Sequence, residues 1–303
     1  MPRWATTLRD LRVGRVETAR GPVEVARSGH GPAVLYVHGM PGSWRQLVPP
    51  AEDMSDDFEV ILPSRPGYGR TPIRSGRTYD EQADLYAALL DALGARRCAV
   101  LAASGGGPSA IAFASRHADR TDALVLLSAL SPHLVTPQRA WKLFRVPLLA
   151  DALVPPLRSV NRRRVSGPRE RDGVVLSRRL TADERRRAGT DPRIGGDLLR
   201  HVLAHREAPA GVAGLRNDYA QIEATRTPRE IAVRCPTLIL HGSADSSVPL
   251  EHARFHQGVI PGAELRVFDD AGHLLALTRR GETSHAVREF LTGRTPGSME
   301  RPT

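Results

Sequence analysis

Hydrophobic and polar positions along this chain alternate between two patterns. Short, continuous apolar runs recur between segments with a helical period, and each run stops at glycine, proline or a polar residue. Such runs are typical of strands buried on both faces, and their alternation with helices favours a mostly parallel sheet. The predicted strands are residues 33–37, 58–63, 99–103, 123–127, 236–240 and 264–268.

The first residues and the helical segments complete this α/β pattern. Two β-like runs, 15–18 and 23–26, flank Arg20-Gly21-Pro22 and predict an opening hairpin. Apolar residues follow a helical period over 79–93, and Gly94 ends that segment. Further helices are predicted over 109–115, 251–259 and 281–291.

The pattern lapses between the runs 123–127 and 236–240. Residues 131–227 contain no clear strand, many prolines and arginines, and short helical pieces such as Leu198–His205. An insertion of this kind between two core strands predicts a helical cap over the open end of the sheet. The expected organisation is a core of residues 1–130 and 228–293, a cap of 131–227 and a flexible tail of 294–303.

The stretch around Ser104 has the sequence of a nucleophile elbow. The apolar run 99–103 ends at this serine, and glycines and Pro108 then open a helical segment. The path of strand, sharp turn and helix is the context in which a small-x-Ser-x-small motif becomes meaningful. Ala102 and Gly106 supply the small residues two before and two after the serine, where the tight turn leaves little room.

Residues that could take part in catalysis also follow other predicted strands, at the sheet edge where ligands bind in open parallel sheets. The order Ser104, Asp245, His273 matches the chain order of a Ser-Asp-His triad. His273 would take the serine proton, and Asp245 would orient and stabilise its ring. The backbone N–H groups of Met40 and Gly105 would face the developing oxyanion.

Two other acids and one other strand end are alternatives for the acid position. Asp269 and Asp270 lie on the same segment as His273, too close along the chain for triad geometry. The position after the run 123–127 holds Ser128, which has no carboxylate. Asp245 is therefore the predicted acid.

The remaining notable histidines are predicted to be structural. His38 and His241 stand beside glycines at strand ends, where they would satisfy loop backbone groups. His252 and His256 have i, i+4 spacing, but Glu251 precedes the pair and no third ligand accompanies it. A solvated helix face is favoured there over a metal site.

With these residues in place, the chain resembles the α/β-hydrolase fold superfamily, in particular its bacterial esterase and proline iminopeptidase-like serine hydrolases. The resemblance is carried by His38–Gly42, Ser64–Gly69, Ala103–Pro108 and Gly272-His273. It implies a three-layer fold with a mostly parallel eight-stranded sheet, an inserted helical cap, a Ser-His-Asp mechanism and no cofactor. A serine nucleophile argues against the epoxide hydrolase and haloalkane dehalogenase branches, which need a carboxylate there.

Two departures from the family pattern are small. Ala102 replaces the usual first glycine of the elbow, and the turn should tolerate it. Ser64 stands where many relatives carry an aspartate before Arg-Pro-Gly, which leaves the chemistry intact but alters loop anchoring.

Charge changes this picture little. The chain has 303 residues and a formal net charge of +10, and Lys142 is its single lysine, so arginine supplies nearly all of the positive charge. Residues 158–187 contain eleven arginines against four acidic residues, without interleaved aromatics or a nucleic-acid motif. A solvated helical surface is therefore favoured over contact with nucleic acid or a membrane.

Cysteine usage and the N-terminus point to the cytoplasm. Cys98 and Cys235 each stand beside a predicted strand and are expected to be reduced, buried residues. Residues 1–15 lack an apolar signal-peptide core, and no segment is apolar enough to span a membrane. The oligomeric state leaves no trace in the sequence.

The predicted function is a serine hydrolase that cleaves a small-molecule ester or related acyl bond without a metal or cofactor. Within enzymes, the alternatives are a proline iminopeptidase, a carbon–carbon bond hydrolase and a cofactor-free perhydrolase. An arginine-rich cap disfavours a free-amine substrate and mildly favours one that bears a carboxylate. From another class, the alternative is a ligand-binding protein with a silent site.

Overall fold

An eight-stranded, mostly parallel sheet forms the centre of the molecule in the computed structural model, which describes residues 8, 10–135, 180–207, 212–225 and 231–293. The strand order is β1-β2-β4-β3-β5-β6-β7-β8. The hairpin of β1 and β2 is antiparallel, β2 pairs antiparallel with β4, and the other neighbours run parallel. The strands are β1 (Arg12–Val16), β2 (Val23–Ser28), β3 (Ala33–Val37), β4 (Glu59–Pro63), β5 (Cys98–Ala103), β6 (Thr121–Leu127), β7 (Thr237–Gly242) and β8 (Glu264–Phe268).

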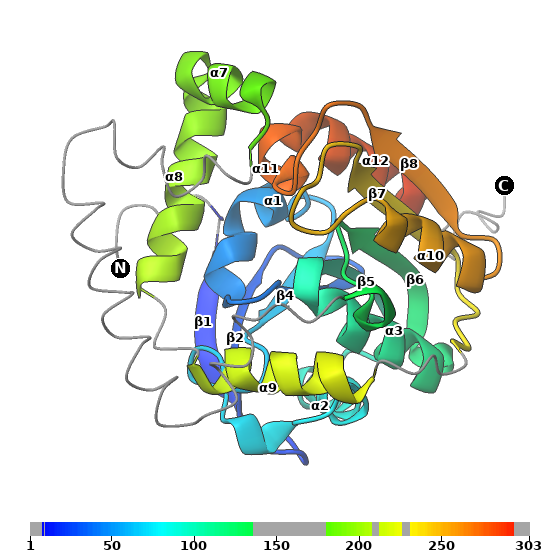
Figure 1. Cartoon of the computed structure of the whole chain (residues 1–303). Helices are drawn as coiled ribbons and strands as arrows, with labels where there is room; N and C mark the ends of the chain where they lie inside the picture. The colour runs from blue at the N-terminus through cyan, green and yellow to red at the C-terminus, as the bar shows by residue number, and fades with distance from the viewer. Residues whose placement is uncertain (1–7, 9, 136–179, 208–211, 226–230, 294–303) are drawn as a thin grey trace, which may run out of the picture.

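Helices cover both faces of this sheet, which gives three layers (Figure 1). One face packs against α2 (Tyr79–Leu93), α3 (Gly107–Arg116) and α10 (Glu251–Val259). The other packs against α1 (Val48–Glu52), α11 (Leu275–Thr278) and α12 (Arg280–Thr292). Short 3-10 helices lie at η2 (Trp44–Leu47), η3 (Ile73–Ser75), η4 (Ser104–Gly106), η5 (Ala118–Arg120) and η6 (Pro132–Leu134).

The strand sequences explain the two cores. Alternate residues of β5 point to opposite faces, so Val100 and Ala102 join the core under α2 and α3, while Ala99 and Leu101 join the core under α1 and α12. Both sets are buried. A central strand of a doubly covered sheet must be apolar at every position, which is why the runs in the sequence are continuous.

Most predicted boundaries agree with the structure. Strands β3 and β8 and helices α2 and α10 begin and end at the predicted residues. Helix α2 begins there because Thr78 and Glu81 form a reciprocal capping box, and it ends at Gly94 in the left-handed conformation. Strand β1 begins three residues earlier than predicted, because its pairing with β2 extends back to Arg12.

The described part of residues 131–227 is helical, with η6 followed by α7 (Ala182–Thr190), α8 (Pro192–Glu207) and α9 (Val212–Ala224). The expectation of short helical pieces was wrong here, since α8 has 16 residues. Helices α7 and α8 lie beside α1 and α11, whereas α9 crosses the molecule near α2 (Figure 1). Residues 136–179, which hold most of the arginine-rich stretch, and the predicted tail 294–303 lie outside the described residues, and the division into core and cap stays a prediction.

Two further expectations concern cysteines and membranes. Cys98 and Cys235 are buried and unbridged, and burial raises the pKa of the Cys98 thiol to about 12 and that of Cys235 to about 11. Both therefore stay protonated. Within the described ranges, no helix combines the length and apolarity needed to cross a membrane.

Candidate active site

Ser104 lies at the sharp turn between β5 and α3. Its φ of +50° is unusual for a residue with a side chain, as an elbow requires. The turn also demands glycine at position 106, because a Cβ there would lie 2.7 Å from the carbonyl oxygen of His38. Ala102 is fully buried at the other small position, as predicted.

Three side chains from distant parts of the sequence form a continuous hydrogen-bonded chain. The Nε2 of His273 lies 3.0 Å from the Oγ of Ser104, and its Nδ1 lies 2.8 Å from the Oδ2 of Asp245. Ser104 follows β5, Asp245 follows β7 and His273 follows β8, so the carboxyl ends of parallel strands bring them together. Both distances fall within the hydrogen-bond reach that a nucleophile and its base require.

The environment of Asp245 holds it as a carboxylate. Burial alone would raise its pKa, but the hydrogen bond and charge of His273 and the backbone N–H of Val248 outweigh burial, and the pKa lies below its usual range. The other oxygen accepts backbone hydrogen bonds of 2.9 Å from Ser247 and Val248. A carboxylate fixed at both oxygens can hold the imidazole in one orientation.

The competing acids lie elsewhere. Asp269 and Asp270 are exposed, and the backbone N–H of Asp270 donates to the hydroxyl of Ser243. Ser128 follows β6 and lines the same pocket as Ser104. Asp245 is therefore the one of these acids that the structure brings to His273.

The loop after β3 lies against the elbow, where the oxyanion donors were predicted. A Cβ built on Gly39 would lie 3.0 Å from the Cβ of Ser104, and one on Gly105 would lie 2.7 Å from the side chain of Met40. Met40 and Gly105 therefore flank Ser104 from two segments. Their role as donors stays a prediction.

His38 anchors this loop, as predicted for a structural histidine. Its Nε2 accepts a 2.9 Å hydrogen bond from the backbone N–H of Arg65, so its Nδ1 carries the proton and donates to the carbonyl of Gly39 at 2.7 Å. The Arg65 guanidinium is fully buried in a bidentate ion pair with Asp218 of α9. One arginine thus connects α9 to the loop beside Ser104.

Ser64 stands where the family resemblance predicts an aspartate, and the carboxylate beside it comes from Glu24 of β2. The Ser64 hydroxyl donates to the buried Glu24 at 2.9 Å, and the same oxygen accepts the backbone N–H of Arg70. The loop after β4 is therefore anchored from the neighbouring strand.

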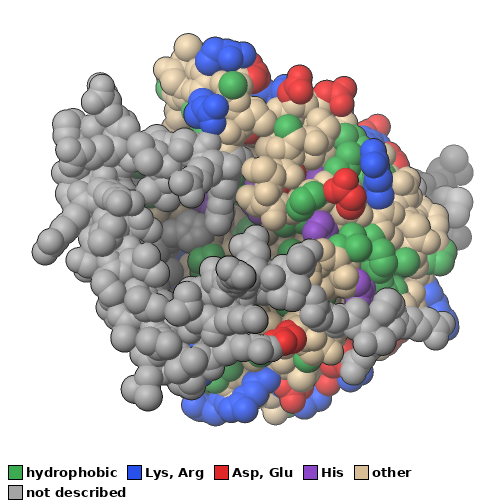
Figure 2. Space-filling model, in the orientation of Figure 1, with side chains coloured by type: hydrophobic (Ala, Val, Ile, Leu, Met, Phe, Trp, Pro, Cys, Tyr) green, Lys and Arg blue, Asp and Glu red, His purple; other side chains and the backbone are tan. Residues whose placement is uncertain are grey.

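A pocket opens above Ser104, with about 630 Å³ of empty space including its mouth. Its described lining is mainly apolar, and besides His273 the ionisable side chains in it are Tyr36 and His201. Burial raises the pKa of Tyr36, so it stays neutral. In the face drawn in Figure 2, histidine side chains lie among hydrophobic ones to the right of the centre of the view. The pocket suits a largely apolar ligand.

His201 of α8 was missed by the sequence reasoning. It follows Ile194 and Leu198 at spacings of seven and three, so it continues the buried face of the helix. A polar residue on an otherwise apolar stripe is the signal that could have identified it.

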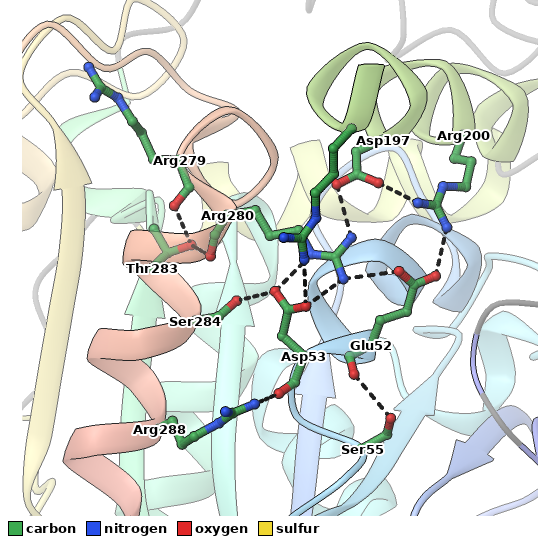
Figure 3. A network of polar contacts seen from close by, with 11 residues as sticks. Glu52, Asp53, Ser55, Asp197, Arg200, Arg279, Arg280, Thr283, Ser284 and Arg288 are labelled. Carbon is green, nitrogen blue, oxygen red and sulfur yellow. Dashed lines mark hydrogen bonds and ion pairs between the residues drawn. The ribbon is translucent and has the colours of Figure 1, made fainter. Parts of the chain in front are cut away.

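An ion-pair network holds α8 at this place (Figure 3). Arg280 at the start of α12 is nearly buried, and it contacts Asp53 at 2.7 Å and both Glu52 and Asp197 at 3.0 Å. Arg200 bridges the same Glu52 and Asp197 from α8. Asp197 is fully buried one helical turn before His201, so α1 and α12 together fix the helix that presents His201.

The interpretation of His252 and His256 as a solvated face was wrong. Both rings are buried, because this side of α10 packs against the sheet and the loop after β6. The Nδ1 of His252 accepts a 2.9 Å hydrogen bond from the backbone N–H of Ser131. His241 is structural, as predicted, and its Nε2 donates to the carbonyl of Val248 at 2.8 Å. Among the described residues, no group of three potential ligands is placed to hold a metal.

Comparison with known proteins finds similarity over most of the chain. The family model described as "alpha/beta hydrolase fold" matches residues 32–279. A solved "alpha/beta hydrolase fold protein" from Nakamurella multipartita is 34% identical, with a TM-score of 0.70, covering 92% of this chain and 99% of that one.

Curated relatives have similar coverage. The "uncharacterized hydrolase YcgS" of Bacillus subtilis is 28% identical over 91% of this chain and 98% of its own length. The 2-hydroxy-6-oxo-2,4-heptadienoate hydrolase of Pseudomonas putida is 29% identical over 93% and 97%, respectively. Both of these relatives are named hydrolases.

Proposed function

Because this chain belongs to the alpha/beta hydrolase fold family and is a hydrolase, we propose that it cleaves a small-molecule ester or related acyl bond through an acyl-enzyme on Ser104. The observation that carries the proposal is the unbroken chain of hydrogen bonds from Ser104 through His273 to Asp245. A serine with an aligned and oriented base is an activated nucleophile. A protein that only binds a ligand has no need of that alignment.

The reaction has two steps. In acylation, the Oγ of Ser104 forms a bond to the acyl carbon while His273 accepts its proton at Nε2, and His273 then gives that proton to the leaving oxygen as the C–O bond breaks. In deacylation, a water takes the place of the leaving group, gives a proton to His273 and displaces Ser104, which recovers its proton. Asp245 stabilises the imidazolium in both steps.

The oxyanion of each tetrahedral intermediate would lie between the loop of Met40 and the elbow. Backbone N–H groups of Met40 and Gly105 are the proposed donors, and loss of one such donor costs roughly 3 to 4 kcal/mol of barrier. An ester fits this machinery because its alkoxide leaving group needs a single proton, which His273 holds at that moment. The mainly apolar pocket favours an ester with an apolar acyl or alcohol part.

A fluorophosphonate probe tests the proposal directly. It should add its mass to the peptide that contains Ser104, and Ser104→Ala should abolish both labelling and hydrolysis of p-nitrophenyl esters of increasing chain length. Labelling of another serine, or no labelling of a folded protein, would overturn it. Proline nitroanilide run alongside tests the iminopeptidase alternative.

A second candidate is carbon–carbon bond hydrolysis, favoured by the similarity to the Pseudomonas putida heptadienoate hydrolase. The same triad would serve it, and His201 is a described group in the pocket that could meet a carboxylate. Turnover of a 2-hydroxy-6-oxo-dienoate at a higher kcat/KM than any ester would replace the ester proposal with this one.

A further inference from the structure

A second serine lies beside the nucleophile in the same unusual conformation. Ala103 of β5 pairs with Leu127 of β6, so Ser104 and Ser128 are the next residues of two adjacent parallel strands. Neighbouring strands lie about 4.8 Å apart. Ser128 has a φ of +45° against +50° for Ser104, and both side chains line the pocket.

The hydroxyl of Ser128 is buried and has no hydrogen-bond partner among the described residues, although its backbone N–H donates to Leu240 at 2.9 Å. A desolvated, unpaired hydroxyl and a left-handed backbone both oppose folding. Alanine at this position would avoid the unpaired hydroxyl, and glycine would avoid both the hydroxyl and the backbone strain. Two such costs at one residue, in the pocket of the nucleophile, indicate that a ligand pairs with this hydroxyl.

The order of the strands indicates which part of the ligand the Ser128 hydroxyl would bind. Strand β5 lies between β3 and β6, so Met40 after β3 and Ser128 after β6 flank Ser104 from opposite sides. His273 comes from β8, on the same side as β6. With the oxyanion on the Met40 side, the leaving oxygen and the water that replaces it lie on the side of His273 and Ser128.

We infer that Ser128 is a further catalytic residue, whose hydroxyl binds the leaving oxygen during acylation and the attacking water during deacylation; this rests on the proposed ester hydrolysis. A serine side chain turns about one torsion, so it can reorient toward the pocket. Its O–H donates to the leaving oxygen as the C–O bond breaks, while the proton that the oxygen gains comes from His273. In deacylation, Ser128 accepts the second O–H of the water while His273 takes the first proton.

Two substitutions remove the hydroxyl with opposite effects on the backbone. Ser128→Ala keeps the strained φ, whereas Ser128→Gly relieves the strain. If the alanine variant does not fold, the glycine variant alone tests the inference. Ser131→Ala is the matched control, because its hydroxyl is also buried and unpaired among the described residues but does not line the pocket of Ser104.

We expect both Ser128 variants to hydrolyse alkyl esters with a kcat about tenfold lower, the effect of one hydrogen bond made in the transition state. With p-nitrophenyl esters, whose leaving group needs little help, they should release a burst of about one equivalent of nitrophenol before slow deacylation. Fluorophosphonate labelling and the Ser131→Ala variant should match wild type.

Unchanged kcat without a burst in both Ser128 variants would overturn the inference while leaving the proposed function intact. A parallel loss of labelling in both variants would also overturn it, because that result assigns Ser128 a structural role. If wild type itself neither labels nor hydrolyses any ester, the proposed function fails first.

Discussion

The buried carboxylate of Glu184 accepts a 3.0 Å hydrogen bond from the backbone N–H of Gly272, the residue before His273. The same oxygen accepts a 2.6 Å hydrogen bond from the hydroxyl of Thr278. The other oxygen accepts a hydrogen bond from the backbone N–H of Thr181 and so caps the start of α7. One side chain therefore joins the start of α7 to the loop that carries the proposed base.

Glu184→Ala should destabilise the protein and slow it. The substitution leaves the buried Gly272 N–H without its partner and the Thr278 hydroxyl with only its 3.3 Å hydrogen bond to the carbonyl of Leu274. An unpaired buried group costs about 1–3 kcal/mol in the free energy of unfolding. It also frees the His273 loop, and small displacements of a catalytic group lower kcat by about tenfold or more. Urea unfolding and ester hydrolysis measure the two effects. Asp183→Ala is the control, since that exposed neighbour pairs only with Arg186 among the described contacts; equal stability of the two variants contradicts the prediction.

Asp245→Asn tests the orientation of His273. An asparagine oxygen can still accept the backbone N–H groups of Ser247 and Val248, so the loop should keep its fold. The amide NH₂ then faces Nδ1 of His273 and moves the ring proton to Nε2, where it blocks proton transfer from Ser104. We expect kcat to fall by about 10³- to 10⁴-fold with a normal circular dichroism spectrum. A loss below tenfold would assign the acid to another residue.

Arg280→Met tests the network that holds α8. The change leaves Asp197 and Asp53 without their shared partner, and breaking a buried ion pair costs about 3–5 kcal/mol. Because α8 presents His201, KM should rise as well. Arg266→Met is the control, since its ion pairs with Glu264 and Glu289 are partly exposed, and exposed pairs contribute about 0–1 kcal/mol. Urea unfolding measures the free energy of unfolding of both variants. Equal losses of stability would mean that the network contributes no more than a surface ion pair.

The sheet and the three proposed catalytic residues could be predicted because their signals are local. A strand covered on both faces must be apolar at each position, and Val100 or Leu238 cannot be replaced by a polar residue without burying an unpaired group. The elbow similarly needs small residues around Ser104. Once parallel strands are placed, their carboxyl ends meet, so Asp245 and His273 were predicted from their positions after strands together with their order along the chain.

The remaining features depend on contacts between distant segments. Arg280 is one arginine among many in the sequence, and only the fold shows that it meets acids from α1 and α8. His252 and His256 read as a polar helix face because sequence spacing does not say what covers a helix. Ser128 was placed at a strand end from the sequence, but His201 is shown to be a pocket residue only by the position of α8.

His256 should make the protein less stable in mild acid. Burial, and then the neighbouring His252, His241 and His133, lower the pKa of this ring to about 3. An unfolded histidine has a pKa of about 6.5, so from about pH 6.5 down to about 3 the unfolded chain binds a proton here that the folded chain does not. The stability that depends on a neutral His256 is complete above that range and is lost as pH falls, at up to about 1.4 kcal/mol per pH unit.

His256→Phe keeps a ring but removes the titration, so its free energy of unfolding should fall less steeply from pH 7 to 4, measured in urea at each pH. His285→Gln, at an exposed position, should keep the wild-type slope, and an unchanged slope in His256→Phe would mean that other groups cause the acid sensitivity.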